Sequence, residues 1–516
     1  MSSVLDEIDA VEPAPDFLSV IAGAKSAFLL SLDVGTSGVR AALFDDGGNE
    51  ISGAQVTSQR NVAAFSDLGV LDADAILSQV VEAIDDLLAT TIGNTHRISL
   101  IAISCFWHSL IGVDNNGRAT TPVLSWADTR AAQSASFLKS HVDENEFHQR
   151  TGCRFHASYW PAKLHWIRHE QPPTFENTKQ WLGFSEYLCQ QLFGTTAMSV
   201  SMASATGLLN QRTCEWDANS LQALQIAPEL LPEIASDFEH PQLRPEFAER
   251  WPALSEARLS MVVGDGAANN IGGGCSTSDR FALMVGTSGA MRVVFEGEPP
   301  DSLPPALWSY RVDRSRVVVG GALSDGGGLF RWLSDLMCVG DDPVDLENRL
   351  AALEPDSRRL TVLPFWSGER STGWSENARG AILGLTQQTK PIEILRAALE
   401  AIAYRFALIA EALEGLTGDA TIVATGNALR SSRAWLQIIA DVLGKGVLLT
   451  NVGEASTRGA ALLALEAVGK IETLQQDSLL IEETFEPDAT RHARYRDGLL
   501  RQQEIYDRLF KSVSIP

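Results

Sequence analysis

Apolar residues near the beginning of the chain follow a strand–turn–strand–turn–strand pattern. Phe28–Leu32 and Val39–Phe44 are apolar runs separated by a turn of glycine and small hydroxyl residues. Asp45–Gly48 has the composition of a tight hairpin turn, and Ile51–Thr57 continues as a third β-rich segment. Ile98–Cys105 is a further β-rich run, so a sheet is predicted at the start of the chain.

The same pattern restarts after a long middle section, Thr129–Leu254, in which the spacing of apolar residues is mostly helical. Leu259–Val263 and Phe281–Val285 are predicted strands, and Met291–Phe295 follows another glycine-rich turn. A chain of 516 residues is too long for one hydrophobic core. The restart therefore predicts two related halves, with a boundary near residues 255–265.

Helical periodicity dominates the remainder of the second half. Ile392–Leu413, Ala434–Leu443 and Ala460–Val468 repeat apolar residues at helical spacing. A charged segment from Asp488 onward predicts one more helix, which is either a solvated surface element or a strut between domains. Strands and helices together indicate an α/β protein.

The string Val-Gly-Thr-Ser-Gly occupies both glycine-rich turns, at residues 34–38 and 285–289. Each copy lies between two apolar strands and is followed by an arginine, Arg40 or Arg292. Such a turn presents consecutive backbone N–H groups and hydroxyls to an anion, and glycine allows the backbone to approach closely. One copy alone fits an ordinary hairpin equally well. The repetition favours a phosphate-binding hairpin in each half.

Two aspartates lie beside these turns. Asp33 ends the first strand, where a carboxylate next to phosphates needs an intervening cation such as Mg²⁺; a capping residue is the alternative. Asp265 lies between two glycines after a predicted strand and suits a general base, although an ordinary turn aspartate has the same spacing. A dinucleotide fingerprint is excluded, because Asn269 stands where its third glycine is required.

Composition and charge exclude several classes of function. The formal net charge of −24 makes nucleic acid and anionic membranes poor partners. Six scattered cysteines without a Cys-x-x-Cys pair indicate free thiols in a reducing compartment. His165 and His169 lack a third zinc ligand, and no P-loop string is present. Without a secretory signal or an apolar run of ~18 residues, the cytoplasm is the expected location.

At these residues the sequence resembles the FGGY carbohydrate kinases of the actin, sugar-kinase and Hsp70 ATPase superfamily, over about Phe28–Leu465. The resemblance implies two related ribonuclease H-like domains, each a mixed β-sheet flanked by helices, around a central cleft for ATP and sugar. The implied division begins with an acidic leader over residues 1–25, for which disorder is one expectation. An N-terminal domain over 26–260 and a C-terminal domain over 261–480 follow, and a C-terminal helix covers 481–516.

The resemblance also implies site residues and the cofactors ATP and Mg²⁺. Asp265 is the expected catalytic base and a substrate contact, and Asp33 is the expected metal ligand. Gly426 and Asn427 belong to an adenosine loop in which Thr425 and Asn427 replace two family glycines. The remaining expected substrate contacts are Trp107, His108, Trp126 and Asp128. The expected ATP contacts are Asp33, Gly35, Thr36, Ser37, Arg40, Gly286, Thr287, Gly327, Gly426 and Asn427.

Motifs around His108, Asp128 and Ala203–Gly207 most resemble the gluconate kinases, which implies phosphorylation of the primary hydroxyl of gluconate to give 6-phosphogluconate. Arg154 or Lys163 is a candidate cation for the acid group, although structural roles are equally compatible. A xylulokinase-like or other ketose or polyol kinase is the alternative. An inactive sugar- and ATP-binding regulator is a different class, which retention of the expected base disfavours. A small sugar or sugar acid is the expected partner, and a homodimer is left open.

Overall fold

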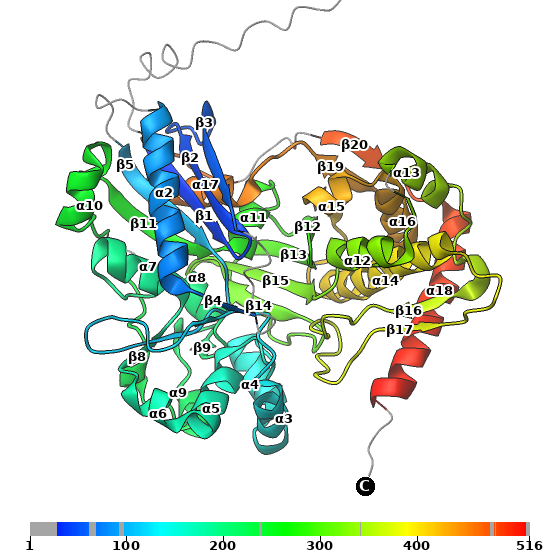
Figure 1. Cartoon of the computed structure of the whole chain (residues 1–516), viewed down its shortest axis with the longest axis horizontal. Coiled ribbons are helices and arrows are strands. Elements are labelled where there is room, and N and C mark those ends of the chain that lie inside the picture. Colours follow the sequence, from blue (N-terminus) through cyan, green and yellow to red (C-terminus); the bar gives the residue numbers. More distant parts are fainter. Residues whose placement is uncertain are drawn as a thin grey trace, which may run out of the picture.

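The computed structural model describes residues 28–60, 69–91, 98–236, 240–340, 342–474, 479 and 481–511. Two mixed sheets, of five and seven strands, form the centres of two α/β halves (Figure 1). The leader predicted over residues 1–25 lies outside the described residues. The two-domain α/β prediction is confirmed.

The first sheet has the order β11-β5-β1-β2-β3. β1 pairs antiparallel with β2 and parallel with β5, and every second residue of β1 (Leu30, Leu32 and Val34) is completely buried. The helix α2, Ala73–Thr91, packs on β2 and β3. The division expected after residue 260 would fall inside β11, which pairs with β5 in this sheet. The strands are β1 Phe28–Gly35, β2 Gly38–Phe44, β3 Glu50–Gln59, β5 Ile98–Cys105 and β11 Arg258–Gly264.

A mostly helical lobe is inserted between β5 and β11; in the view of Figure 1 most of it lies below the first sheet, and its last helix lies beside that sheet. Its helices are α3 Ala132–His141, α4 Glu144–Thr151, α5 Trp160–Glu170, α6 Pro172–Asn177, α7 Phe184–Phe193, α8 Val200–Ser204, α9 Ala218–Leu224 and α10 Pro245–Arg250. The short strands associated with it are β4 Val70–Leu71, β6 Ile111–Val113, β7 Val123–Leu124, β8 Gln180–Leu182, β9 Leu209–Asn210 and β10 Glu215–Trp216. This confirms the helical middle section predicted from the sequence.

The second sheet has the order β14-β15-β13-β12-β18-β19-β20. The segment from 481 begins with the strand β20, which pairs with β19, before the predicted helix α18 follows behind its cap Asp488. The strands are β12 Arg280–Val285, β13 Gly289–Glu296, β14 Trp308–Arg311, β15 Arg316–Leu323, β18 Thr421–Thr425, β19 Val447–Thr450 and β20 Ile481–Phe485, with a separate pair β16 Thr361–Leu363 and β17 Ala381–Leu383. The helices are α12 Gly327–Met337, α13 Pro343–Ala351, α14 Pro391–Thr417, α15 Asn427–Arg430, α16 Arg433–Leu443 and α18 Ala489–Tyr506.

Two helices join the halves by a very close crossing. α11, Asp265–Gly272, follows the last strand of the first sheet, and α17, Ala455–Ala467, comes from far along the chain but lies against that sheet (Figure 1). A Cβ atom on Gly272 would lie 1.8 Å from the carbonyl oxygen of Ala455, and one on Gly459 would lie 1.8 Å from that of Ala268. Glycine is therefore required at both crossing points, and the crossing fixes how the halves meet.

Side chains from the second sheet also enter the core of the first half. The phenol groups of Tyr159 and Tyr310 share a hydrogen bond of 2.6 Å, and Trp308 stacks on Tyr310 while both rings contact Trp107. The core is thus continuous between the lobe and the β14–β15 hairpin. Among the described helices, none combines the length and the apolar character that crossing a bilayer requires.

Candidate active site

The first glycine-rich turn connects β1 to β2, and an arginine holds its carbonyl groups. Arg60 donates from its guanidinium to the carbonyls of Gly35 and Thr36, at 3.1 and 2.7 Å, and its backbone N–H donates to that of Ser37 at 2.8 Å. Gln79 of α2 accepts another guanidinium N–H at 2.8 Å. With its carbonyl oxygens occupied in this way, the turn has fewer acceptors that would repel a phosphate.

The second turn connects β12 to β13, and backbone N–H groups hold its carbonyls. The N–H groups of Gly327 and Gly328, in the first turn of α12, donate to the carbonyls of Gly286 and Thr287 at 2.8 and 3.0 Å. A Cβ on Gly327 would lie 2.7 Å from the Gly286 oxygen, so glycine is needed for this approach. Gly327 thus supports the second turn, whereas nothing lies within 4 Å of a Cβ on Gly286, and that residue faces open space.

The expected adenosine loop follows β18 and lies directly against the second turn. Gly426 has φ of +95°, and a Cβ there would lie 2.5 Å from the carbonyl oxygen of Val285. Thr425 ends the strand and Asn427 begins α15, so neither residue needs a positive φ. The two departures from the family glycines therefore stand at positions where no glycine conformation is needed, and the one positive φ of the loop falls on Gly426.

Asp33 is buried at the end of β1 and already has partners. Ser104 donates to one carboxylate oxygen at 2.8 Å, and Arg40, directly opposite on β2, donates to the other at 3.0 Å. Burial raises the pKa of Asp33, although Arg40 opposes the shift. Arg40 also pairs with Glu454 at 2.6 Å, so the expected ATP contact Arg40 bridges two acids.

Asp265 is the first residue of α11, directly after β11, and is half-buried. Burial raises its pKa to about 6; Arg292 opposes this shift and the negative charge of Asp33 adds to it. Asp265 begins a helix that packs against β1, the strand that carries Asp33, and the negative charge of Asp33 contributes to the raised pKa of Asp265. At neutral pH most Asp265 side chains are ionised and able to accept a proton, which is the requirement for a general base.

The indole ring of Trp107 forms the floor beside Asp265. Its Nε1 donates to the carbonyl of Ser201 at 3.2 Å, and a Cβ on Gly264 would lie 1.7 Å from the same nitrogen. A Cβ on Gly266 would lie 2.5 Å from the far edge of the ring. The two glycines that flank Asp265 are therefore required by the tryptophan that covers them.

His108 follows with φ of 66°, an unusual value for a residue other than glycine. Its Nδ1 lies 2.8 Å from the carbonyl of Ala205, so Nδ1–H donates and Nε2 is left as an acceptor. Burial lowers the pKa of His108 to about 3, and the ring is neutral at physiological pH. A neutral acceptor among the rings of Tyr159 and Tyr310 suits a substrate hydroxyl.

Asp128 and Trp126, the other two expected substrate contacts, each have an arginine as their neighbour. The carboxylate of Asp128 is buried and accepts three hydrogen bonds from the Arg130 side chain, at 2.7 to 3.2 Å, so it orients that arginine. The ring of Trp126 is half-buried and lies under the guanidinium of Arg370, with 4.8 Å from Cζ to the ring centre.

Both cations suggested for an acid group have structural partners. Lys163 Nζ donates to the carbonyls of His108, Leu124 and Ser125, at 2.7, 3.2 and 2.9 Å. Arg154 pairs with Glu144 at 2.5 Å. Burial lowers the pKa of Lys163 to about 7, and its three N–H donors are all used. Lys163 therefore supports the backbone around His108, and it has no donor left for a ligand.

Sequence reasoning missed Arg370 as a site residue, which a loop of the second half brings against Trp126 of the first half. Its Nη2 donates to the carbonyl of Leu323 at 3.0 Å, while its Nε is buried without a partner. Its guanidinium lies over the Trp126 ring, and its charge adds to the lowering of the pKa of His108 and His156 that burial causes. Nothing in the local sequence indicated which way this side chain points.

A buried carboxylate anchors this loop. Glu369 accepts from Arg405 at 2.7 Å and from the backbone N–H groups of Gly373 and Ser375. The loop continues to Trp374, whose carbonyl accepts from Lys139 at 2.8 Å. Glu376 accepts from the backbone N–H of Ala157 at 3.0 Å. Both last contacts are with the first half, so the loop connects the two halves across the cleft.

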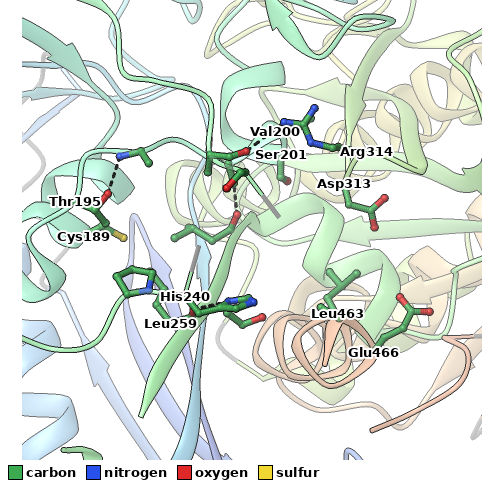
Figure 2. Close-up of a pocket in the computed structure, with 18 of the residues that line it drawn as sticks. Cys189, Thr195, Val200, Ser201, His240, Leu259, Asp313, Arg314, Leu463 and Glu466 are labelled. Atoms are coloured by element: carbon green, nitrogen blue, oxygen red, sulfur yellow. Dashed lines mark hydrogen bonds between the residues drawn. The ribbon is translucent and has the colours of Figure 1, made fainter. Parts of the chain in front are cut away.

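A cavity of about 490 Å³ is lined in part by residues of α8 and β11 (Figure 2). Ser201, whose hydroxyl accepts from the Gly264 N–H and whose carbonyl holds Trp107, forms part of its wall. Leu259 of β11 and Glu466 of α17 lie on other sides. None of the ATP or substrate contacts expected from the sequence lines this cavity.

Models of one protein family match both halves of the chain. The model of the N-terminal domain of the FGGY family of carbohydrate kinases matches residues 28–272, and that of the C-terminal domain matches residues 281–468. A gluconokinase of Bacillus subtilis is 30% identical over 491 residues, which cover 92% of this chain and 93% of that protein. A xylulose kinase of Escherichia coli is 26% identical over 499 residues, 94% of this chain and 99% of that protein.

Solved structures give the same result. A gluconate kinase from Lactobacillus acidophilus superposes with a TM-score of 0.85 at 27% identity, covering 94% of this chain and 99% of that one. A xylulose kinase from the same organism also has a TM-score of 0.85 at 27% identity, covering 95% and 99%. Overall similarity in structure therefore does not separate the two substrates.

Proposed function

The chain belongs to the FGGY family of carbohydrate kinases, and on that premise we propose that it transfers the γ-phosphoryl group of ATP to a primary hydroxyl of gluconate. As a member of this family it is a phosphotransferase with an alcohol group as acceptor. The observation that carries the mechanism is the position of Asp265, ionisable near pH 6, between two glycine-rich turns and above the Trp107 floor.

Asp265 is the base in the proposed reaction. Its carboxylate accepts the proton of the primary hydroxyl as the hydroxyl oxygen bonds to the γ-phosphorus, and the bond from that phosphorus to the bridging oxygen of ADP breaks. The two turns hold the phosphates through backbone N–H groups, and Trp107 and His108 orient the acceptor. Closure of the cleft excludes water, which would otherwise compete with the sugar.

Mg²⁺ fits beside Asp33. Among the described residues no cluster of three or more His, Cys, Asp or Glu side chains forms a metal site, so the protein alone does not enclose a cation. Mg²⁺ commonly takes one or two carboxylates together with phosphate oxygens and water. Asp33 supplies such a carboxylate, close enough to Asp265 to raise its pKa. When bound, the metal would neutralise phosphate charge.

Gluconate is supported as the acceptor by the gluconokinase relatives and by the composition of the cleft. The relatives named gluconokinase are 30% and 28% identical to the chain over more than 90% of its length. Arg292 and Arg370 bring two positive charges to the site, where burial lowers the pKa of both guanidinium groups and the negative charge of Asp265 opposes that shift. A xylulose acceptor is the second candidate, supported by the xylulose kinase structure of equal TM-score.

Formation of ADP in the presence of gluconate, xylulose, ribulose and glycerol tests the proposal. We expect the highest kcat/KM with gluconate, and a product phosphorylated at the terminal carbon. Asp265→Asn is expected to fold and to reduce kcat ~10²–10⁴-fold, the range of general-base catalysis. Near-normal kcat in this variant would remove the base assignment. A higher kcat/KM with xylulose would show that xylulose, and not gluconate, is the acceptor. ATP turnover that no sugar stimulates would favour a regulator that only binds its ligands.

A further inference from the structure

Arg292 is a buried cation on the face of β13 that looks toward the first half. Its neighbours on that face are Ala290 and Val294, both buried, because alternate residues of a strand share a face. Val294 packs in the core that includes the first sheet, whereas Met291 and Val293 pack in the core of the second half. Arg292 therefore stands in an otherwise apolar surface at the cleft, with 7% of its area exposed.

Its guanidinium has no acidic partner. Nε and Nη1 are buried without a hydrogen bond, and among the described residues no carboxylate lies within 4 Å of it. Asp265 is close enough for the two groups to shift each other's pKa values, yet they form no ion pair. The chain has 65 acidic and 41 basic residues, so acids were available to pair with a buried arginine. An unpaired buried charge is costly, which points to an anionic ligand.

The guanidinium lies beside the floor formed by Trp107. A Cβ on Gly266 would be 2.5 Å from the Trp107 ring and 3.2 Å from Cζ of Arg292. An acceptor that rests on this floor therefore has a buried cation next to it.

We propose that Arg292 binds the carboxylate of the acceptor and thereby selects sugar acids over neutral sugars; this rests on the proposed function. Arginine suits the task because it stays charged and matches the planar carboxylate with paired N–H donors. Two other roles are distinguishable from this one. A contact with the γ-phosphoryl group, or adjustment of the Asp265 pKa alone, would affect every acceptor equally.

The first test measures ligand-induced stabilisation, which does not depend on turnover. In the wild-type protein, gluconate and MgADP are each expected to raise the unfolding temperature. In Arg292→Met the gluconate shift should disappear while the MgADP shift remains, and Arg292→Lys should recover part of it. Loss of both shifts, or of neither, would overturn the proposal. Arg311→Met, which removes a buried arginine of β14 that has hydrogen-bond partners, is the control for general damage to this sheet.

The second test compares acceptors in the same variant. Arg292→Met should raise KM for gluconate ~30-fold or more, as expected when one partner of a buried charge pair is removed. D-Glucitol, in which a neutral CH₂OH replaces the carboxylate, should bind the variant as well as it binds the wild type. Equal weakening of gluconate and glucitol would contradict the proposal. Absence of gluconate phosphorylation in the wild type would instead contradict the proposed function, so the two failures are separate.

Discussion

The two glycine-rich turns have the same five residues, but they are not the same hairpin. In the first, Gly35 pairs with Gly38 and a two-residue loop remains. In the second, Val285 pairs with Gly289 and three residues remain in the loop. Their carbonyl groups are also held differently, by an arginine in the first turn and by the N-terminus of α12 in the second.

The difference in register changes what each hairpin presents. The first places Asp33 and Arg40 opposite one another as an ion pair. At the equivalent places in the second string stand Met284 and Met291, and the arginine comes one residue later, on the other face of its strand. A slip of one residue moves a side chain to the opposite face of a sheet. The first hairpin thus carries an ion pair, and the second is a neutral turn with a separate, unpaired arginine.

The largest effect that separates the hairpins is expected at Asp33. Asp33→Asn removes the carboxylate available to a metal ion and should lower kcat/KM for ATP ~10²–10³-fold, as loss of an electrostatic contact at a reacting phosphate does. Met284→Leu, the matched change in the second hairpin, should stay within about threefold because volume is conserved. Steady-state kinetics with varied MgATP measures both. Equal losses would mean that the hairpins share one role.

A smaller effect is expected from Arg60, which holds the carbonyl groups of the first turn. Arg60→Met should raise KM for ATP ~10–100-fold with a smaller change in kcat, because hydrogen bonds from a charged donor each contribute about 1.5–3 kcal/mol. Arg433→Met, at a mostly exposed side chain, is the control. An unchanged KM would show that the first turn keeps its shape without these contacts.

The smallest effect concerns pH. Asp265 acts as a base in its ionised form, and burial raises its pKa to about 6. We therefore expect kcat/KM to be high above that pH and to decrease as the pH falls through about 6. Asp33 contributes to this elevation through its charge. Asp33→Asn should therefore move the acid limb of the pH profile to lower pH, and Met284→Leu should leave it in place. An acid limb that moves to higher pH in Asp33→Asn would contradict the influence of the Asp33 charge on Asp265.

Strands and long helices were predictable because their periodicity is local. Ile98–Cys105 was predicted with the bounds that β5 has, and the helix after Asp488 begins where that cap indicates. α11 was not predicted, since its short run of Gly, Ala and Asn is buried on nearly all sides between two domains and lacks an amphipathic pattern. The different registers of the two hairpins could not be predicted either, because the two five-residue strings are identical.

The candidate site was predictable where motif and strand end coincide, as at Asp33 and Asp265. It was not predictable where long-range contacts decide a side chain's role. Lys163 resembles a free cation in the sequence, and only the fold shows its three carbonyl partners. Arg370 reaches the cleft from the other half on a loop held by Glu369, and no spacing in the sequence records that direction.

That loop has a thermodynamic consequence. Trp107 and His108 belong to the first half, while Arg370 and Trp374 come from the half that holds the second turn, so an acceptor in contact with both sides stabilises the arrangement in which they meet. If this arrangement also binds nucleotide more tightly, linkage makes the coupling mutual: the factor by which an acceptor increases nucleotide affinity equals the factor by which nucleotide increases acceptor affinity. Ligand recognition and domain closure are then a single equilibrium.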